Sequence, residues 1–282
     1  MLRSMREVLR NLRWPVLCLG GTLQLVRAGP GKDLVRRFEF TDKGDIRMTK
    51  YVAFSGGKDS TALALLLPDS IPVFTDTGAE FPEMYGHIEK FEKVTGREVI
   101  RLKSKEGSLL DYMRRTKFMP GHAARYCTRI FKIEPFEKFT DTYAVAIRAD
   151  ENRKGNTSDK VIYPLREMGI GLMDVIQICT EYDLLPRYPV YMARGGCVNC
   201  YYKRKSEVLA MDDFVPEVLD ELQDIEDGVQ DKRGRFAFMF PNSGMSIRDI
   251  RKQMSLFSPE DVYREASDKS DYGQACGMFC NR

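Results

Sequence analysis

The feature that most constrains the fold is a strand, a tight loop and a helix written in one line, YVAFSGGKDSTALALLL, at residues 51–67. The first four residues are typical of a short buried strand, and the run after Lys58 is typical of an apolar helix that ends at Pro68 and Asp69. Two adjacent glycines between them permit positive φ and let backbone amides approach a ligand closely. We therefore expect a ligand to be held in this loop.

Strand and helix patterns alternate along the chain from this unit onward. Each expected strand is rich in β-branched and aromatic residues and ends in turn residues. Strand–helix alternation predicts an α/β fold, a doubly wound and mostly parallel sheet with right-handed crossovers, here with a C-terminal helical extension. Ligands of such sheets bind beyond the carboxyl ends of the strands, where the loop lies. The expected strands are 50–55, 71–78, 97–104 and 143–151, and the expected helices are 81–96, 108–115 and 133–139.

Composition excludes several classes of protein. The 282 residues are 43% hydrophobic and 30% charged, which is typical of a soluble globular chain. No run approaches the roughly 20 apolar residues of a membrane span, so we expect no membrane partner. The net charge of +3 is too small to indicate nucleic acid by itself. Seven cysteines in a chain of this length favour a reducing, cytoplasmic compartment and metal or redox chemistry over disulfides.

Charge is unevenly distributed, because residues 1–47 carry a net charge of +5 and the remainder carries −2. A signal peptide fits the basic flanks and the apolar stretch, but no small-residue cleavage site follows. No motif supports a basic nucleic-acid arm. The codons for KGDIRM can spell a purine-rich ribosome-binding site just before Met48. We therefore expect residues 1–47 to be a mis-called extension, disordered if made, with translation starting at Met48.

The loop itself has the composition of an oxyanion cradle, formed by Ser55, Gly56, Gly57, Lys58, Asp59 and Ser60. The following helix presents its N-terminal amides, the two serines add hydroxyl donors, and the lysine adds a positive charge. It is not a Walker P-loop, which needs four residues between its first glycine and the Gly-Lys pair. A lone Gly-Gly pair is usually only a tight turn, but six matching residues after a buried strand indicate an anion site.

These residues resemble the PP-loop ATP pyrophosphatases, and within them the phosphoadenosine phosphosulfate (PAPS) reductase-like family. SGGKDS is the signature loop of that superfamily, and the resemblance covers about residues 50–206, just over half of the chain. Further segments resemble the family's motifs in the right order. They are FTDTGAEFPEMY at 74–85, RYCTRIFKIEPFEKF at 125–139 (Arg-x-Cys-x-x-x-x-Lys-x-x-Pro), AIRADENR at 146–153, YPLREMGIGLMDVIQICTEYDLLPRYPVY at 163–191 and GGCVNC at 195–200.

The resemblance implies an adenine nucleotide alpha hydrolase-like fold and a transferase reaction in which ATP is cleaved between its α and β phosphates, adenylylating a substrate. Lys58 and the loop amides would stabilise the leaving pyrophosphate. Asp59 would either cap the helix or help to hold Mg²⁺, and Asp76, with Thr77, would lie near the nucleotide. Arg148 and Arg153, with Glu151 between them, would either clamp an anion or form a solvated salt-bridge cluster. The predicted site residues are thus catalytic Lys58, Asp59 and Arg148, and nucleotide-binding Ser55, Gly56, Gly57, Lys58, Asp59, Ser60, Asp76, Thr77 and Arg153.

Some residues depart from the family pattern. Ala146 and Asn152 replace a usual glycine and serine, and the usual tryptophan after Tyr-Pro-Leu is missing. PAPS reductases typically alter the SGGKDS loop and end in a Glu-Cys-Gly-(Ile/Leu)-His motif. This chain keeps the loop, and His87 and His122 lie far from its C-terminus. An ATP enzyme is therefore favoured over two alternatives, a PAPS or APS (sulfonucleotide) reductase and a non-catalytic nucleotide-binding accessory subunit.

The cysteines form a second constellation. Cys197-x-x-Cys200 follows a Gly-Gly turn, and Cys127 lies 70 residues earlier; such thiolates bind zinc or an iron–sulfur cluster, or form a redox pair. Several PP-loop enzymes that thiolate tRNA hold a [4Fe–4S] cluster on three cysteines, and the resemblance implies the same for these three. The basic residues Lys203, Arg204 and Lys205 would offset the cluster's charge. Of the remaining cysteines, Cys276 and Cys280 are candidate fourth ligands, Cys179 is expected in the core, and Cys18 lies in the doubtful leader.

The domain organisation and partners follow from these assignments. We expect a PP-loop and cysteine domain at 48–206 and a helical extension at 207–282, with an acidic helix near 214–235 and a short basic helix near 245–254. Besides the adenine nucleotide, a sulfur-donor protein and a tRNA or DNA substrate stay open as partners, and no oligomeric state is predicted. A basic groove could contact a phosphate backbone; its residues are Arg114, Arg115, Lys117, Arg125 and Arg129.

Overall fold

The computed structural model describes residues 50–253, apart from 141, 156–157, 193–195 and 231–237, together with the backbone of three short strands before residue 40. The chain divides into two compact units, Met1–Thr49 and Lys50–Arg282. In the first unit, β1 (Val16–Leu19), β2 (Thr22–Val26) and β3 (Val35–Glu39) form an antiparallel sheet in that order. The expectation that residues 1–47 are not translated stays a prediction.

The second unit is built on a five-stranded, all-parallel sheet in the order β6-β5-β4-β7-β8. Its strands are β4 (Tyr51–Ala53), β5 (Ile71–Asp76), β6 (Ile100–Lys103), β7 (Tyr143–Ala144) and β8 (Val161–Ile162). The chain runs outward from β4 to β6 and then returns to the other side of β4. The order therefore reverses between β4 and β7, and in open α/β sheets such a switch point is where ligands bind. The doubly wound α/β fold predicted from the sequence is confirmed.

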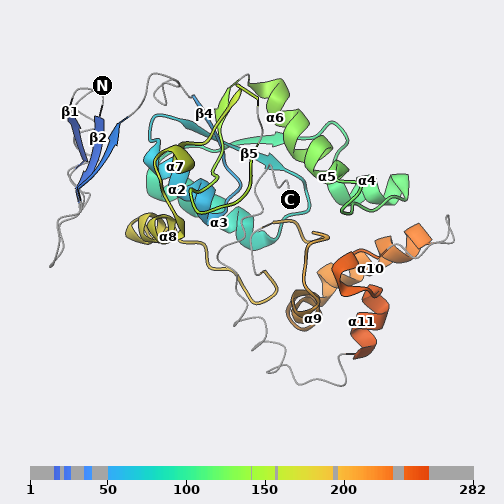
Figure 1. Ribbon diagram of the computed structural model, residues 1–282. Helices are drawn as coiled ribbons and strands as arrows, with labels where there is room; N and C mark the ends of the chain where they lie inside the picture. Colours follow the sequence, from blue (N-terminus) through green and yellow to red (C-terminus); the bar gives the residue numbers. More distant parts are fainter. Residues whose placement is uncertain are drawn as a thin grey trace. The chain divides into compact units, whose positions relative to one another are not determined.

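Helices cover both faces of this sheet (Figure 1). The helices α2 (Lys58–Leu66) and α3 (Pro82–Thr95) follow β4 and β5 and lie on one face, with α8 (Leu172–Glu181) packed on α2. The other face is covered by a helical stretch made of α5 (Tyr126–Thr128), a π-helical turn η2 (Arg129–Ile133) and α6 (Glu134–Phe139). There Phe136 and Tyr143 pack ring to ring at 4.5 Å. Two further helices complete this part, α4 (Leu109–Thr116) and α7 (Pro164–Glu167).

The C-terminal helices form one apolar core with α4. They are α9 (Lys205–Phe214), α10 (Pro216–Gln230) and α11 (Ile247–Gln253), with a 3-10 turn η3 (Pro241–Ser243) before the last. Glu226 of α10 is fully buried, and its carboxylate accepts hydrogen bonds from the amides of Met239 (2.7 Å) and Ile247 (2.8 Å). Burial raises the pKa of Glu226, although these two amides lower it. None of the described helices is long and apolar enough to cross a membrane.

Local sequence signals explain most element boundaries. Helix α3 begins at Pro82 and ends at Gly96, which adopts φ +65° as its C-cap, as expected. The acidic helix is α10 and the basic one is α11. The strand expected over 143–151 is wrong in length, because β7 ends at Ala144. The amide of Val145 still bonds to the carbonyl of Ile162 (2.9 Å), but that of Ile147 turns back to Val145 (3.0 Å), so the chain leaves the sheet there.

Candidate functional site

The loop between β4 and α2 depends on its two glycines for different reasons. Gly56 adopts φ +72°, and a Cβ there would lie 2.9 Å from Cε of Met84, so the loop conformation itself requires glycine. Gly57 is the N-cap of α2 with φ −81° and ψ 161°, a conformation open to any residue. A Cβ on Gly57 would find only ordinary contacts, with Oγ of Ser55 (3.4 Å) and the hydroxyl of Tyr188 (3.8 Å). The protein alone therefore gives little reason for this second glycine.

The two serines close the loop on itself. The Ser60 hydroxyl donates to the carbonyl of Gly57 (3.0 Å) and accepts a hydrogen bond from the amide of Ser55 (3.1 Å). The two serine hydroxyls are also 3.1 Å apart. Ser60 is 4% exposed, so its proton is committed within the protein. Both serines lie in the loop as predicted, and their visible task is to hold the loop shape.

The amides at the start of α2 have the character of an anion site. In the part of the chain that the structure describes, the amides of Gly57, Lys58 and Asp59 donate to no other protein group. Gly57 supplies no side chain to cap them. The first amides of a helix carry partial positive charge and bind phosphate or carboxylate oxygens well. The residues present therefore fit the phosphate tail of a nucleotide substrate.

Lys58 and Asp59 are buried beside these amides. Lys58 is 8% exposed, and its ammonium lies 3.7 Å from the Asp59 carboxylate. Burial lowers the pKa of Lys58, while the Asp59 charge raises it. The thiol of Cys179, from α8, donates to the Lys58 carbonyl (3.3 Å), and burial raises the pKa of this thiol to about 12. Cys179 is fully buried, so its expected place in the core is confirmed.

Asp59 is held by Arg148, which follows β7 on the neighbouring side of the switch point. The guanidinium of Arg148 donates to Asp59 (2.9 Å) and Asp150 (2.8 Å) and lies 3.4 Å from Glu151. Arg148 is only 2% exposed. Burial lowers the pKa of Arg148, but Asp59 and the other carboxylates outweigh burial and raise it overall. Asp59 therefore makes a buried ion pair, and no side-chain bond caps α2.

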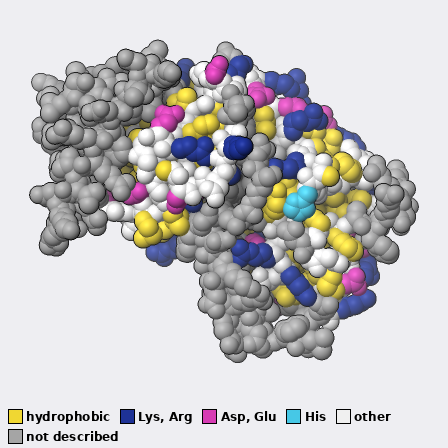
Figure 2. All heavy atoms as spheres, in the orientation of Figure 1, with side chains coloured by type: hydrophobic (Ala, Val, Ile, Leu, Met, Phe, Trp, Pro, Cys, Tyr) yellow, Lys and Arg dark blue, Asp and Glu magenta, His cyan; other side chains and the backbone are white. Residues whose placement is uncertain are grey.

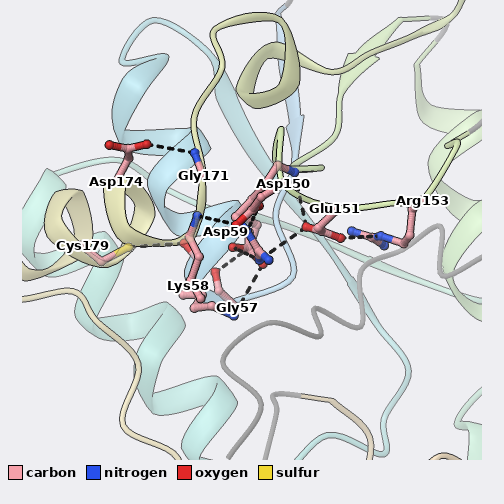
Figure 3. A network of polar contacts seen from close by, with 12 residues as sticks. Gly57, Lys58, Asp59, Asp150, Glu151, Arg153, Gly171, Asp174 and Cys179 are labelled. Carbon is pink, nitrogen blue, oxygen red and sulfur yellow. Dashed lines mark hydrogen bonds and ion pairs between the residues drawn. The ribbon is translucent and has the colours of Figure 1, made fainter.

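The network continues outward to Arg153 (Figure 3). Glu151 lies between Asp59 and Arg153 in this view, and the Arg153 guanidinium donates to Glu151 through Nε at 2.7 Å. Its Nη2 atom is buried and bonds to no group in the described ranges. A buried guanidinium nitrogen without a partner is costly, and a bound anion would remove that cost. Of the two arginines predicted as a clamp, Arg153 therefore keeps a donor for an anion.

Asp76 and Thr77 lie at the carboxyl end of β5, as predicted, but both are engaged. Oδ1 of Asp76 accepts hydrogen bonds from the Gly78 amide (2.8 Å) and the Tyr85 hydroxyl (2.7 Å). Oδ2 of Asp76 lies 3.8 Å from the Lys103 ammonium. Burial, with the Asp76 bond, raises the pKa of Tyr85. In this arrangement Asp76 shapes the turn after β5, and its role toward Mg²⁺ stays a prediction.

A second cluster surrounds Cys197. Its thiol donates to Oε1 of Glu80 (3.3 Å), which also accepts the Thr77 hydroxyl (3.1 Å) and lies 3.6 Å from the Lys132 ammonium. The Glu80 side chain is 3% exposed, so these contacts stabilise a buried carboxylate. Burial raises the pKa of the Cys197 thiol, and Glu80 raises it further. Cys197 is thereby placed beside the turn after β5, 117 residues away in sequence from Glu80.

The three predicted cluster ligands lie in the same region. Cys127 and Cys197 both pack against the same apolar core, and the amide of Cys200 bonds back to the Cys197 carbonyl (3.2 Å). Within the described ranges, however, no group of three or more His, Cys, Asp or Glu side chains is arranged to hold a metal ion. The iron–sulfur or zinc site therefore stays a prediction. Cys276 and Cys280 lie outside the described residues.

The predicted basic residues are mostly engaged. Arg114 pairs with Asp111 and Glu221, and Arg115 with Glu106. Lys203, expected to offset a cluster, is instead buried. Its ammonium donates to the carbonyl of Tyr191 (3.0 Å), lies 3.7 Å from Glu207 and 4.6 Å from the Phe81 ring centre.

Sequence reasoning did not assign roles to three residues that line these sites. Tyr188 lies beside the loop, whereas Glu80 and Lys132 lie beside Cys197. Glu80 and Lys132 each stand inside a segment that resembles a family motif. A charged residue in a segment otherwise expected to be buried is the signal that could have found them.

Comparison with known protein families gives a match to this part of the chain. Residues 49–162, from β4 through β8, match the family of the phosphoadenosine phosphosulfate reductase domain. This match supports, over these residues, the resemblance to the PAPS reductase-like family that the sequence motifs indicated. The matched range contains the loop 55–60, the Asp76 turn, Cys127 and Arg148, but it ends before Cys197.

Two curated relatives and one solved structure are similar to parts of this chain. Uncharacterized protein MJ0973 of Methanocaldococcus jannaschii is 24% identical over 193 residues, covering 61% of this chain and 46% of the relative. Uncharacterized protein MJ0066 of the same organism is 35% identical over 103 residues, covering 34% and 20%. The chain thus spans less than half the length of these relatives. The phosphoadenylyl-sulfate (PAPS) reductase of Candida auris, solved with phosphate, is 15% identical with a TM-score of 0.38, covering 48% of this chain and 74% of that one.

Proposed function

We propose that this protein binds ATP at the loop 55–60 and cleaves it between the α and β phosphates, adenylylating a substrate for sulfur transfer or for modification of a nucleic acid or metabolite. The observation that carries the proposal is the set of amides at Gly57, Lys58 and Asp59, which donate to no other group in the described chain. Three convergent amides beside a buried lysine suit a polyanion better than a single carboxylate.

The placement of charge supports cleavage at the α–β bond. The β and γ phosphates would lie against the loop amides and Lys58, and the α phosphate would lie toward the switch point, with the buried Nη2 of Arg153 as its proposed donor. An acceptor oxygen attacks the α phosphorus, the bond to the bridging oxygen breaks, and pyrophosphate leaves with the negative charge. The amides and Lys58 stabilise that charge as it develops. A sulfur nucleophile could then displace AMP from the adenylylated acceptor.

For Arg148 we propose a positioning role. Its guanidinium contacts three carboxylates and is 2% exposed, so it fixes Asp59 and Glu151 beside the loop without a further anion. Asp59 in turn stays 3.7 Å from the Lys58 ammonium. The Mg²⁺ that accompanies ATP, and an iron–sulfur cluster on Cys127, Cys197 and Cys200, stay proposals, and no step above passes through a cluster.

Calorimetry on the full chain, purified without oxygen, tests this function. The ligands are ATP–Mg²⁺, its α,β-methylene analogue, adenosine phosphosulfate and PAPS. We expect ATP and its analogue to bind most tightly. Lys58→Ala should abolish that binding, and Lys90→Ala, which removes an exposed lysine paired with Asp183, should leave it unchanged. Tighter binding of a sulfonucleotide would instead identify a reductase. ATP binding without pyrophosphate release, with every candidate acceptor, would identify an accessory subunit.

A further inference from the structure

Aromatic side chains pack together where residues 118–126 meet the turn after the CxxC segment; Phe118, His122 and Tyr202 are accessible, whereas Tyr126 and Tyr201 are buried (9% and 3% exposed). Phe118 is 37% exposed and stacks on Tyr126 with an interplanar angle of 25° and a centroid distance of 5.4 Å. His122 is exposed and meets Tyr201 and Tyr202 edge to face, at 5.2 and 5.0 Å. The two tyrosine rings are 4.4 Å apart. We call these five residues the aromatic ledge.

The aromatic ledge borders the cysteines. Tyr126 directly precedes Cys127, and Tyr201 directly follows Cys200. A planar group lying on the ledge would therefore lie beside the two segments that carry these cysteines. An acceptor bound there would be close in the chain to the proposed cluster ligands.

Basic residues adjoin the ledge residues in the sequence. Arg125 directly precedes Tyr126, and Arg129, one turn further on, has 70% of its side chain exposed. Lys117 precedes Phe118, and the acid nearest to Arg129 is Glu134, at the long distance of 3.8 Å. Figure 2 shows a histidine side chain on one face of the molecule among hydrophobic side chains, with Lys and Arg side chains around them. Rings bordered by cations complement a ligand with flat bases and phosphates.

We propose that the aromatic ledge binds an unpaired base of a single-stranded nucleic acid, with Arg125 and Arg129 on its phosphates; this rests on the proposed function, whose acceptor it names. Unpaired bases are bound by stacking on aromatic rings and guanidinium planes, which every base permits. The ledge presents ring faces and cations together. The bases of a duplex are paired and stacked inside it, so a duplex would offer this surface only its phosphates. Binding is therefore expected to discriminate against paired strands.

Fluorescence anisotropy with a labelled 15-nucleotide strand tests the ledge on the full chain. The probes are an RNA, the DNA of the same sequence and the matched duplex. We expect the single strands to bind and Tyr202→Ala and His122→Ala each to weaken binding by about 5- to 150-fold. Phe214→Ala removes another exposed ring, 54% exposed on α9, and should change nothing. Arg129→Ala should lower the salt slope by about 1, and the matched Arg101→Ala should not.

Several results would overturn the proposal. They are no binding of either single strand, equal binding of the duplex, or ledge variants that bind like Phe214→Ala. If Tyr202→Ala melts early, Tyr202→Leu removes the ring but keeps apolar volume, and the same loss is required of it. ATP calorimetry on each variant separates the two proposals. Intact ATP binding with no strand binding overturns the ledge alone, and strand binding without ATP binding overturns the proposed function.

Discussion

Replacing Gly57 by alanine separates the needs of the fold from those of the ligand. The backbone of Gly57 is open to alanine, and the new Cβ would meet Ser55 and Tyr188 only at ordinary contact distances of 3.4 and 3.8 Å. Alanine is a poorer N-cap than glycine, so we expect a loss of about 0.5–1 kcal/mol in the free energy of unfolding. A methyl group over the amides should remove one charge-assisted bond to phosphate, worth about 1.5–3 kcal/mol. This corresponds to about 10- to 150-fold weaker ATP binding.

The assays are calorimetry with ATP–Mg²⁺ and urea unfolding of the same variant. Gly86→Ala is the matched control, because its Cβ would meet nothing within 4 Å on helix α3. In a helix interior this change should stabilise the fold by about 0.5–1 kcal/mol and leave ATP binding unchanged. If Gly57→Ala binds ATP within about twofold of the unaltered protein, the phosphates do not lie against the loop, and the reasoning is refuted.

Three further predictions concern stability, each measured by urea unfolding. Arg148→Met should lower the free energy of unfolding by about 3–5 kcal/mol, because it leaves two carboxylates buried without their cation. Arg101→Ala breaks an exposed ion pair and should lower it by less than about 1 kcal/mol. Equal losses would contradict the buried network. Arg97→Met should cost about 1–3 kcal/mol, because this guanidinium donates to carbonyls at the end of α2, and no loss would show that water replaces it. Burial lowers the pKa of His87 from 6.5 to about 4, so the unfolded chain takes up a proton at a higher pH than the folded chain. As the pH falls from 6.5 to about 4, the free energy of unfolding should therefore decrease, and below about pH 4 it should level off. His87→Gln should flatten that profile, and parallel profiles would disprove the burial effect.

The first half of the sheet could be predicted because its signals are local. Turn and cap residues such as Gly56, Pro82 and Gly96 fix the ends of β4, α2 and α3 within a few residues of the patterns that form them. The same locality placed the loop 55–60 at the carboxyl end of a strand. Resemblance of motifs then indicated the family that residues 49–162 match.

The partners of the site residues could not be predicted in the same way. Arg148 and Asp59 are 89 residues apart, and Glu80 and Cys197 are 117 apart, so only the packed fold decides that they meet. A charged residue near a loop can bind a ligand or form an ion pair with a neighbour, and the residue type alone does not distinguish these two roles. The engagement of Arg114 by Glu221, from the C-terminal helices, is a further contact of this kind.

The π-helical turn at Arg129–Ile133 contains one residue more than a regular turn would need, between Cys127 and Lys132. Each residue of an α-helix advances about 100° around its axis, so losing one residue here would swing Lys132 by that angle relative to Cys127 and away from Glu80. Among descendants of a common ancestor, a single codon gained or lost in this turn would thus decide whether the buried carboxylate keeps its cation. In homologous sequences, the number of residues in this turn is therefore more informative than whether a lysine stands at the position of Lys132.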